Sequence, residues 1–208
     1  MPTSSPSGQS CQPQAASCQP AAAGRPSALI FDLGQTLVPF SFEPLRPQLE
    51  SCRAAATALV NELEIGALDA ARFQQKMGRL AGLAPEAFLP WWNSIFEPRW
   101  LVPPELLRRL LREYRVGLLS NTNALHFAYL EQTFPLLREF AFRIVSHEVG
   151  AAKPSARIYA AAEAAAQCAP ADILYFDDIP EFVAAARRRG WRAEVFAGAD
   201  DLRRPLAL

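Results

Sequence analysis

The sequence predicts an α/β fold with a parallel sheet and helices on both of its faces. Short apolar runs recur along the chain, as expected of strands that are covered on both faces; they are 28–31, 116–119, 142–145, 173–176 and 193–196. Amphipathic helical patterns separate them, at 104–114, 124–132, 154–167 and 180–189. Strands that alternate with helices favour a parallel sheet joined by right-handed crossovers.

The boundaries of these helices also have a local signal. Three of the four helical patterns have a proline near the first turn, where the missing N–H costs nothing because the first amides of a helix have no intrahelical partner. These prolines are Pro104, Pro154 and Pro180. The sequence therefore predicts that the corresponding helices begin there.

The interval between the first two strands is too long for a simple crossover, which needs only about a dozen residues. Apolar residues at helical spacing within it predict about three amphipathic helices; they are Leu49, Cys52, Ala56, Leu59, Val60 and Leu63, then Phe73, Met77 and Leu80, then Phe88, Trp92 and Phe96. We therefore predict a small helical cap at 41–102, inserted after the first strand of an α/β core formed by 27–40 and 103–208.

The N-terminal segment differs from the rest in composition. Residues 1–26 contain five Pro, five Ser and four Gln, with Arg25 as their only charge and no aromatic residue. Such a segment buries too little apolar surface to offset the entropy lost on ordering. We predict a disordered tail.

Composition and charge exclude several classes of protein. The 208 residues are half apolar and carry 21 basic and 21 acidic side chains, which excludes a coiled coil, a collagen or a wholly disordered chain. Zero net charge argues against a dedicated nucleic-acid partner, because that binding needs many Lys and Arg contacts to phosphate. No apolar stretch is long enough to span a membrane, and neither a signal nor a transit peptide is evident, so we expect a cytoplasmic protein. The four cysteines show no zinc-site spacing.

The side chains best suited to catalysis or ligand binding follow the predicted strands. In an open parallel sheet, ligands bind beyond the carboxyl ends of the strands, and these ends are followed by Asp32, by 120–123 (Ser-Asn-Thr-Asn), by Ser146 leading to Lys153, and by Asp177-Asp178. Three converging carboxylates require a cation, and oxygen ligands select a hard ion such as Mg²⁺. A lysine and a hydroxyl beside that ion would bind an anion, as phosphoryl transfer requires.

Four segments in this order resemble the four motifs of the haloacid dehalogenase (HAD) superfamily. They are 30–37 (IFDLGQTL), 118–123 (LLSNTN), Lys153-Pro154 and 175–178 (YFDD). More closely, they resemble the bacterial α-D-glucose-1-phosphate phosphatase-like branch, whose members are Mg²⁺-dependent sugar-phosphate phosphatases with a helical cap. The resemblance implies a Rossmann-like HAD core.

The resemblance also implies a role for each motif residue. Asp32 would be the nucleophile that forms an aspartyl-phosphate and a ligand of Mg²⁺, with the Gly34 carbonyl and Asp178 as further ligands. Ser120 and the Asn121 backbone would bind phosphoryl oxygens, and Lys153 would bridge Asp32 and the phosphate. Asp177 would lie next to the metal in an outer role.

One position departs from the superfamily pattern. Most HAD phosphatases have a second Asp two residues after the nucleophile as general acid/base, and here this position is Gly34. Losing such a group costs about 10²- to 10⁴-fold in rate. Glycine also permits a positive φ, in which a side chain would be strained. His126, one turn into the helix after the second motif, is a candidate replacement donor, although a histidine at such a place is more often structural.

Three functions follow from this departure. The leading hypothesis is a Mg²⁺-dependent phosphatase acting on a small phosphorylated metabolite, most simply a sugar phosphate. The second is a catalytically weak HAD-like binding or regulatory protein, which Gly34 favours. The third is a 2-haloacid dehalogenase, which needs no acid but typically has Ser-Asn in place of Asp177-Asp178. The sequence leaves the oligomeric state open.

Overall fold

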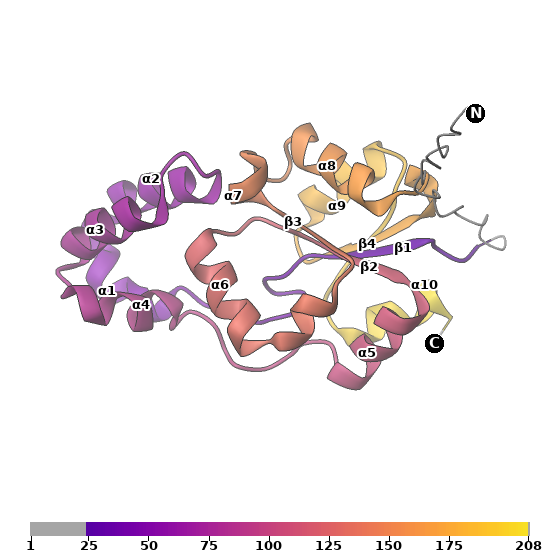
Figure 1. Cartoon of the computed structure of the whole chain (residues 1–208), viewed down its shortest axis with the longest axis horizontal. Helices are drawn as coiled ribbons and strands as arrows, with labels where there is room; N and C mark the ends of the chain where they lie inside the picture. The colour runs from indigo at the N-terminus through magenta and orange to yellow at the C-terminus, as the bar shows by residue number, and fades with distance from the viewer. Residues whose placement is uncertain (1–23, 208) are drawn as a thin grey trace, which may run out of the picture.

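The computed structural model describes residues 24–207 and has one parallel sheet at its centre (Figure 1). Its strands are β1 (Ala28–Phe31), β2 (Arg115–Ser120), β3 (Phe142–Val145), β4 (Ile173–Asp177) and β5 (Arg192–Val195). All neighbouring strands are parallel, and the spatial order is β3-β2-β1-β4-β5. The predicted α/β fold is confirmed.

Alternate residues of each strand enter two different apolar layers. Leu29 and Phe31 of β1 pack with Phe176 into a cluster on one face, under α5, α6 and α10. Ile30 packs with Tyr175 on the opposite face, under α8 and α9. Because a strand alternates its side chains, an apolar run without polar interruptions is what this three-layer arrangement requires.

The helices around the sheet follow the predicted ones closely. Their bounds are α5 (Pro104–Glu113), α6 (Ala124–Thr133), α7 (Ser146–Val149), α8 (Ala156–Ala166), α9 (Pro180–Arg188) and α10 (Arg203–Leu206). The prediction that a helix begins at Pro154 is wrong. α8 begins two residues later, because Ser155 is its N-cap and its hydroxyl accepts from Arg157 N.

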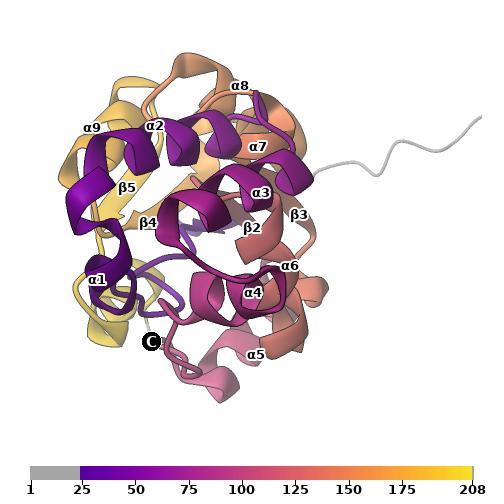
Figure 2. The ribbon, with the colours of Figure 1, turned by 90° about the vertical axis from the view of Figure 1, so that its left-hand side faces the viewer.

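Four helices between β1 and β2 form a separate layer with its own apolar cluster (Figure 2). They are α1 (Arg46–Leu49), α2 (Arg53–Glu64), α3 (Ala70–Ala81) and α4 (Pro85–Asn93). Within the cluster Phe88 stacks on Trp92, and the ring of Phe73 lies edge-on to Phe88 and tilted against Trp92. The helices of the predicted cap are thus present, while its treatment as a domain bounded at 41 and 102 stays a prediction.

The chain enters and leaves this helical layer along two paired segments. Ser41 N donates to Ile95 O at 2.8 Å, and Glu97 N donates to Pro39 O at 3.1 Å. The layer also contacts the core through α4 on α6 and through α2 on α7. These contacts bring the C-terminal end of α2 close to the loops that follow the strands.

Most of the predicted N-terminal tail lies outside the described residues, which begin at Gly24. Its last residues contact the core: Arg25 donates to Glu113 O at 3.4 Å, and its guanidinium lies 4.6 Å from the ring centroid of Tyr114. Within 24–207, no helix has both the length and the apolar character needed to cross a bilayer.

Candidate active site

The strand register brings the predicted functional residues to one edge of the sheet. Asp32 directly follows β1, and its backbone N–H donates to Phe176 O of β4 at 2.9 Å. Asp177 is the last residue of β4, and Ser120 is the last residue of β2 on the other side of β1. The two carboxylates and the hydroxyl therefore meet at the carboxyl ends of three adjacent strands.

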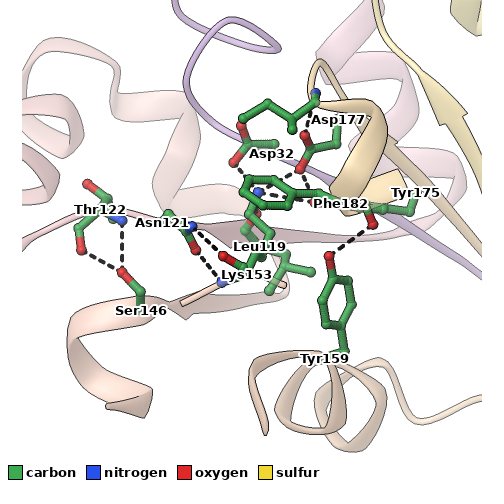
Figure 3. A network of polar contacts seen from close by, with 11 residues as sticks. Asp32, Leu119, Asn121, Thr122, Ser146, Lys153, Tyr159, Tyr175, Asp177 and Phe182 are labelled. Carbon is green, nitrogen blue, oxygen red and sulfur yellow. Dashed lines mark hydrogen bonds and ion pairs between the residues drawn. The ribbon is translucent and has the colours of Figure 1, made fainter. Parts of the chain in front are cut away.

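The Lys153 ammonium lies at the centre of this group (Figure 3). Its Nζ donates to Asp32 Oδ1 at 2.8 Å and to Asp177 Oδ2 at 2.6 Å, and it also contacts Leu119 O at 3.1 Å. Only 1% of the lysine side chain is exposed. Burial alone would lower the pKa of Lys153, but attraction to the two carboxylates outweighs it and raises the pKa, so the side chain is a permanent cation.

Tyr175 belongs to the same network, although sequence analysis did not select it. Its hydroxyl donates to Asp177 Oδ2 and lies 3.1 Å from Lys153 Nζ. Burial, followed by the charge of Asp177, raises the pKa of Tyr175 well above its ordinary value, so it remains a neutral donor. A period of two places Tyr175 and Asp177 on the same face of β4, which is the signal that identifies it.

Phe182 lies in the first turn of α9, the helix that follows the fourth motif. Its ring centroid lies 5.0 Å from Lys153 Nζ, close enough for a cation–π contact with the ammonium. Figure 3 shows this ring beside the lysine. Lys153 thus has an aromatic face beside it in addition to the two carboxylates.

Three carboxylates could hold a metal ion. Asp32, Asp177 and Asp178 each offer an oxygen, and these oxygens lie within 4.8 Å of one another. Asp177 is already occupied by Lys153, by Tyr175 and by Ile179 N, which donates to Oδ1 at 2.8 Å. The half-buried Asp178 has no such partners within the described part of the chain, so it is the freer second ligand.

The electrostatics of the cluster favour a bound cation. Burial raises the pKa of Asp32 to about 6, with Lys153 opposing the shift and Asp177 adding to it. Burial and the charge of Asp177 likewise raise the pKa of Asp178. One ammonium does not compensate three carboxylates, and a divalent ion with oxygen preference fits the remaining negative charge.

The loop after β2 is fixed by its side chains rather than by its backbone alone. Asn121 Oδ1 accepts from Lys153 N at 2.7 Å, and its Nδ2 donates to Lys153 O at 3.1 Å. Ser146 Oγ accepts from Thr122 N at 2.9 Å and donates to Thr122 O at 2.8 Å. The Asn121 side chain thus positions the lysine. Ser146, the first residue of α7 after β3, fixes Thr122 of this loop, and sequence analysis did not select it as a site residue.

Gly34 does not have the positive φ that its glycine suggested. Instead, a Cβ at this position would lie 2.7 Å from a ring carbon of Phe40, far inside van der Waals contact. The Phe40 ring therefore takes the space of the missing side chain. An acidic group at position 34 would require this ring to move.

Contacts within the fold hold the His126 ring on both nitrogens, so we propose that it is structural and is not the replacement proton donor. Its Nε2–H donates to Trp92 O at 3.0 Å, and its Nδ1 accepts from Asn123 Nδ2 at 3.0 Å. The ring stacks on Trp92 with centroids 4.5 Å apart. Burial lowers the pKa of His126 to about 4. The imidazole is neutral, and neither nitrogen is available to a substrate.

This arrangement predicts acid sensitivity. His126 takes up a proton at its ordinary pKa of 6.5 when the chain is unfolded, but only at about 4 when folded. Its contribution to the free energy of unfolding is complete above pH 6.5 and decreases by about 3 kcal/mol as the pH falls to 4. Urea unfolding from pH 7 to 4.5 should show a smaller loss of stability for His126→Asn than for the natural protein and for His147→Asn. Equal losses of stability in all three proteins would contradict the role of His126 in acid sensitivity.

A small hollow opens beside the carboxylate cluster. Its volume is about 60 Å³, and its lining combines the strand-end loops with cap residues; the lining residues are Leu33, Gly34, Phe40, Phe42, Glu64, Ile95, Phe96, Ser120, Asn121, Thr122, His126 and Leu130. Most of this wall is apolar. The carboxylic acid in this lining is Glu64. Sequence analysis did not find Glu64 because the position of this residue depends on how the cap docks on the core.

Comparisons with known proteins identify the family and the fold. A family model described as a haloacid dehalogenase-like hydrolase matches residues 26–190. The HAD family enzyme bt-2542 from Bacteroides thetaiotaomicron is similar in structure, with a TM-score of 0.76, 22% identity, and coverage of 86% of this chain and 98% of that chain. The same enzyme has been solved in complex with magnesium and inorganic phosphate.

Two further structures share the fold. An HAD-like family hydrolase from Porphyromonas gingivalis has a TM-score of 0.71 and 23% identity, over 89% of this chain and 97% of that one. The L-2-haloacid dehalogenase from Xanthobacter autotrophicus is more distant, with a TM-score of 0.54 and 17% identity, over 82% and 77%. The family match spans β1 to the end of α9 and so includes Asp32, Lys153 and Asp177. The chain therefore belongs to the haloacid dehalogenase-like hydrolases.

Proposed function

We propose that the protein is a Mg²⁺-dependent phosphatase that hydrolyses a small phosphate monoester through an aspartyl-phosphate. The observation that carries this proposal is the Lys153 ammonium, held at 2.8 Å from Asp32 within a cluster of three carboxylates. A nucleophilic carboxylate beside a fixed cation and a cation site is the arrangement that phosphoryl transfer needs, because an anionic ester must approach an anionic nucleophile.

Asp32 has the position of the nucleophile in this proposal. One of its oxygens attacks phosphorus while the bond from phosphorus to the ester oxygen breaks, which transfers the phosphoryl group to Asp32. Water then attacks the phosphorus and releases Asp32. Lys153, already within hydrogen-bond distance of Asp32, neutralises phosphoryl charge, and Ser120 and the Asn121 N–H donate to phosphoryl oxygens from the end of β2.

Mg²⁺, when bound, would supply charge neutralisation at the phosphoryl oxygens. Asp32, the Gly34 carbonyl and Asp178 would hold it, and Asp177 would lie beside it. Asp177 suits this outer position because Lys153, Tyr175 and Ile179 N already occupy its oxygens.

For the substrate we propose a small phosphorylated metabolite, with sugar phosphates as the first class to test. The small hollow supports a compact substrate, since about 60 Å³ holds little beyond the phosphoryl group. The choice of a sugar rests on the resemblance to glucose-1-phosphate phosphatase-like proteins. Phe42 lines both this hollow and a neighbouring cap cavity of about 380 Å³, which is the direction in which a larger leaving group would extend.

A catalytically weak binding protein is the second candidate, and the observation in its favour is the absence of an acid at Gly34. The dehalogenase alternative has less support, because Asp178 adds a carboxylate that a metal-free reaction does not need. Phosphate release from a panel of sugar and aryl phosphates, with and without Mg²⁺, separates the three. Chelator-sensitive release supports the phosphatase. Binding of phosphate esters without turnover supports the weak protein, and halide release from 2-haloacids supports the dehalogenase.

Asp178→Ala should increase the Mg²⁺ concentration needed for half-maximal activity by at least about tenfold, since it removes a charged ligand from the metal site. The measurement is the initial rate of phosphate release against Mg²⁺ concentration. Asp200→Ala is a matched control, because the Asp200 side chain is 92% exposed and pairs with Arg203 at the surface. An unchanged Mg²⁺ requirement would remove Asp178 from the metal site.

A further inference from the structure

Glu64 lies where the cap meets the small hollow beside the carboxylate cluster. It is the last residue of α2, and it lines the hollow together with Gly34, Ser120 and Asn121. The side chain is half-buried. A carboxylic acid from the cap therefore faces the same space as the proposed nucleophile's loop and the proposed phosphate-binding loop.

Glu64 has no hydrogen-bond or ion-pair partner among residues 24–207. The elements packed against α2 are α3, α7 and the turn Glu50–Cys52. None of the titratable and charged side chains on these elements has a hydrogen bond or ion pair with Glu64; they are Arg72, Lys76, Arg79, His147, Glu148, Glu50 and Cys52. Burial alone raises the pKa of Glu64 above its ordinary value, which favours the protonated acid that a donor must be.

The other groups around the hollow cannot supply a proton to a leaving group. Position 34 is glycine, and the Phe40 ring lies against it. Both ring nitrogens of His126 are occupied within the fold. Among the residues that line the hollow, Glu64 is thus the one with an unengaged acidic proton.

We propose that Glu64 is the proton donor to the leaving group, in place of the acid that position 34 lacks; this rests on the proposed phosphatase function. As Asp32 attacks phosphorus and the bond to the ester oxygen breaks, that oxygen takes the proton of the Glu64 carboxyl and leaves as an alcohol. The Glu64 carboxylate then accepts a proton from the water that attacks the phosphorus of the aspartyl-phosphate. The bond to Asp32 breaks, inorganic phosphate leaves, and the Glu64 acid is restored.

A test is the dependence of rate on the leaving group in Glu64→Gln, an isosteric change that removes the proton. For an alkyl phosphate, which leaves poorly without protonation, kcat/KM should fall by at least about 10²-fold. For 4-nitrophenyl phosphate, which leaves as a stabilised anion, it should fall less than about threefold. Wild-type kcat/KM for the alkyl ester should also decrease at high pH as Glu64 ionises, and this decrease should be absent in Glu64→Gln.

Glu62→Gln is the matched control, because Glu62 is exposed on the same last turn of α2. It should leave both rates and the pH profile unchanged. Equal losses for the aryl and alkyl esters in Glu64→Gln, or no loss for either, would overturn the role of Glu64 while leaving the phosphatase intact. If the natural protein releases no phosphate from any ester with Mg²⁺ present, the proposed function fails and the role of Glu64 fails with it.

Discussion

Asp32→Asn should reduce phosphate release by more than about 10³-fold, the largest loss expected of any single change in this protein. An amide has no anionic oxygen to attack phosphorus, and it is a weaker ligand for a divalent cation. Initial rates with an aryl phosphate in saturating Mg²⁺ measure the effect. An aryl ester is chosen because its turnover does not depend on protonation of the leaving group.

The fold should tolerate this substitution. Burial raises the pKa of Asp32 to about 6, which shows that the buried charge costs free energy in the folded state despite Lys153. A neutral isostere removes that cost, so the free energy of unfolding should change by less than about 1 kcal/mol. Asp200→Asn, on the surface, controls for the loss of one negative charge. Turnover by Asp32→Asn within about tenfold of the natural protein would remove Asp32 from the nucleophile role.

The parts of the site that sequence predicts are those fixed by strand ends. Asp32, Ser120 and Asp177 each follow or end an apolar run, and parallel strands bring their carboxyl ends to one edge. Lys153 is further from its strand, yet the loop after β3 returns it to the same edge. The order of the strand ends predicts that Asp32, Ser120 and Asp177 meet, whereas Lys153 is identified by its resemblance to the third motif.

Other features depend on packing between segments that are distant in sequence. The Phe40 ring rests on Gly34 because the chain turns back before entering the cap, so the glycine accommodates a neighbour rather than a positive φ. Glu64 reaches the hollow because α2 docks on α7. Periodicity predicts which face of α2 is apolar, but not against which loop its last turn lies.

His126 illustrates why residue type alone does not establish a role. Its place after the second motif suggested a proton donor. Its surroundings are the Trp92 carbonyl, the Asn123 amide and an aromatic face, all of which favour a neutral ring. The partner from α4 is a backbone carbonyl, which has no signature in the sequence.

Lys153→Met should destabilise the protein by about 3–5 kcal/mol at pH 7, because removal of one partner leaves buried charge without compensation. Asp32 and Asp177 have side chains that are 10% and 0% exposed, and both receive a hydrogen bond from the lysine. Without the ammonium the folded-state pKa of Asp32, already raised to about 6 by burial, rises further above its unfolded value. A carboxyl group whose pKa is raised by folding destabilises the folded state at the pH values where it is ionised. The loss of stability in Lys153→Met should therefore become smaller as the pH falls from 7 to 5.

Urea unfolding at pH 7 and pH 5 tests this expectation. Lys76→Met is the matched control, since Lys76 is the other lysine of the chain and is exposed on α3. Adding Asp177→Asn to Lys153→Met removes one of the two stranded carboxylates and should restore part of the lost stability. A deficit that is the same at both pH values, and that Asp177→Asn does not reduce, would mean that Lys153 stabilises the fold through packing of its stem. In that case a cation other than Lys153 would have to compensate the buried carboxylates of Asp32 and Asp177.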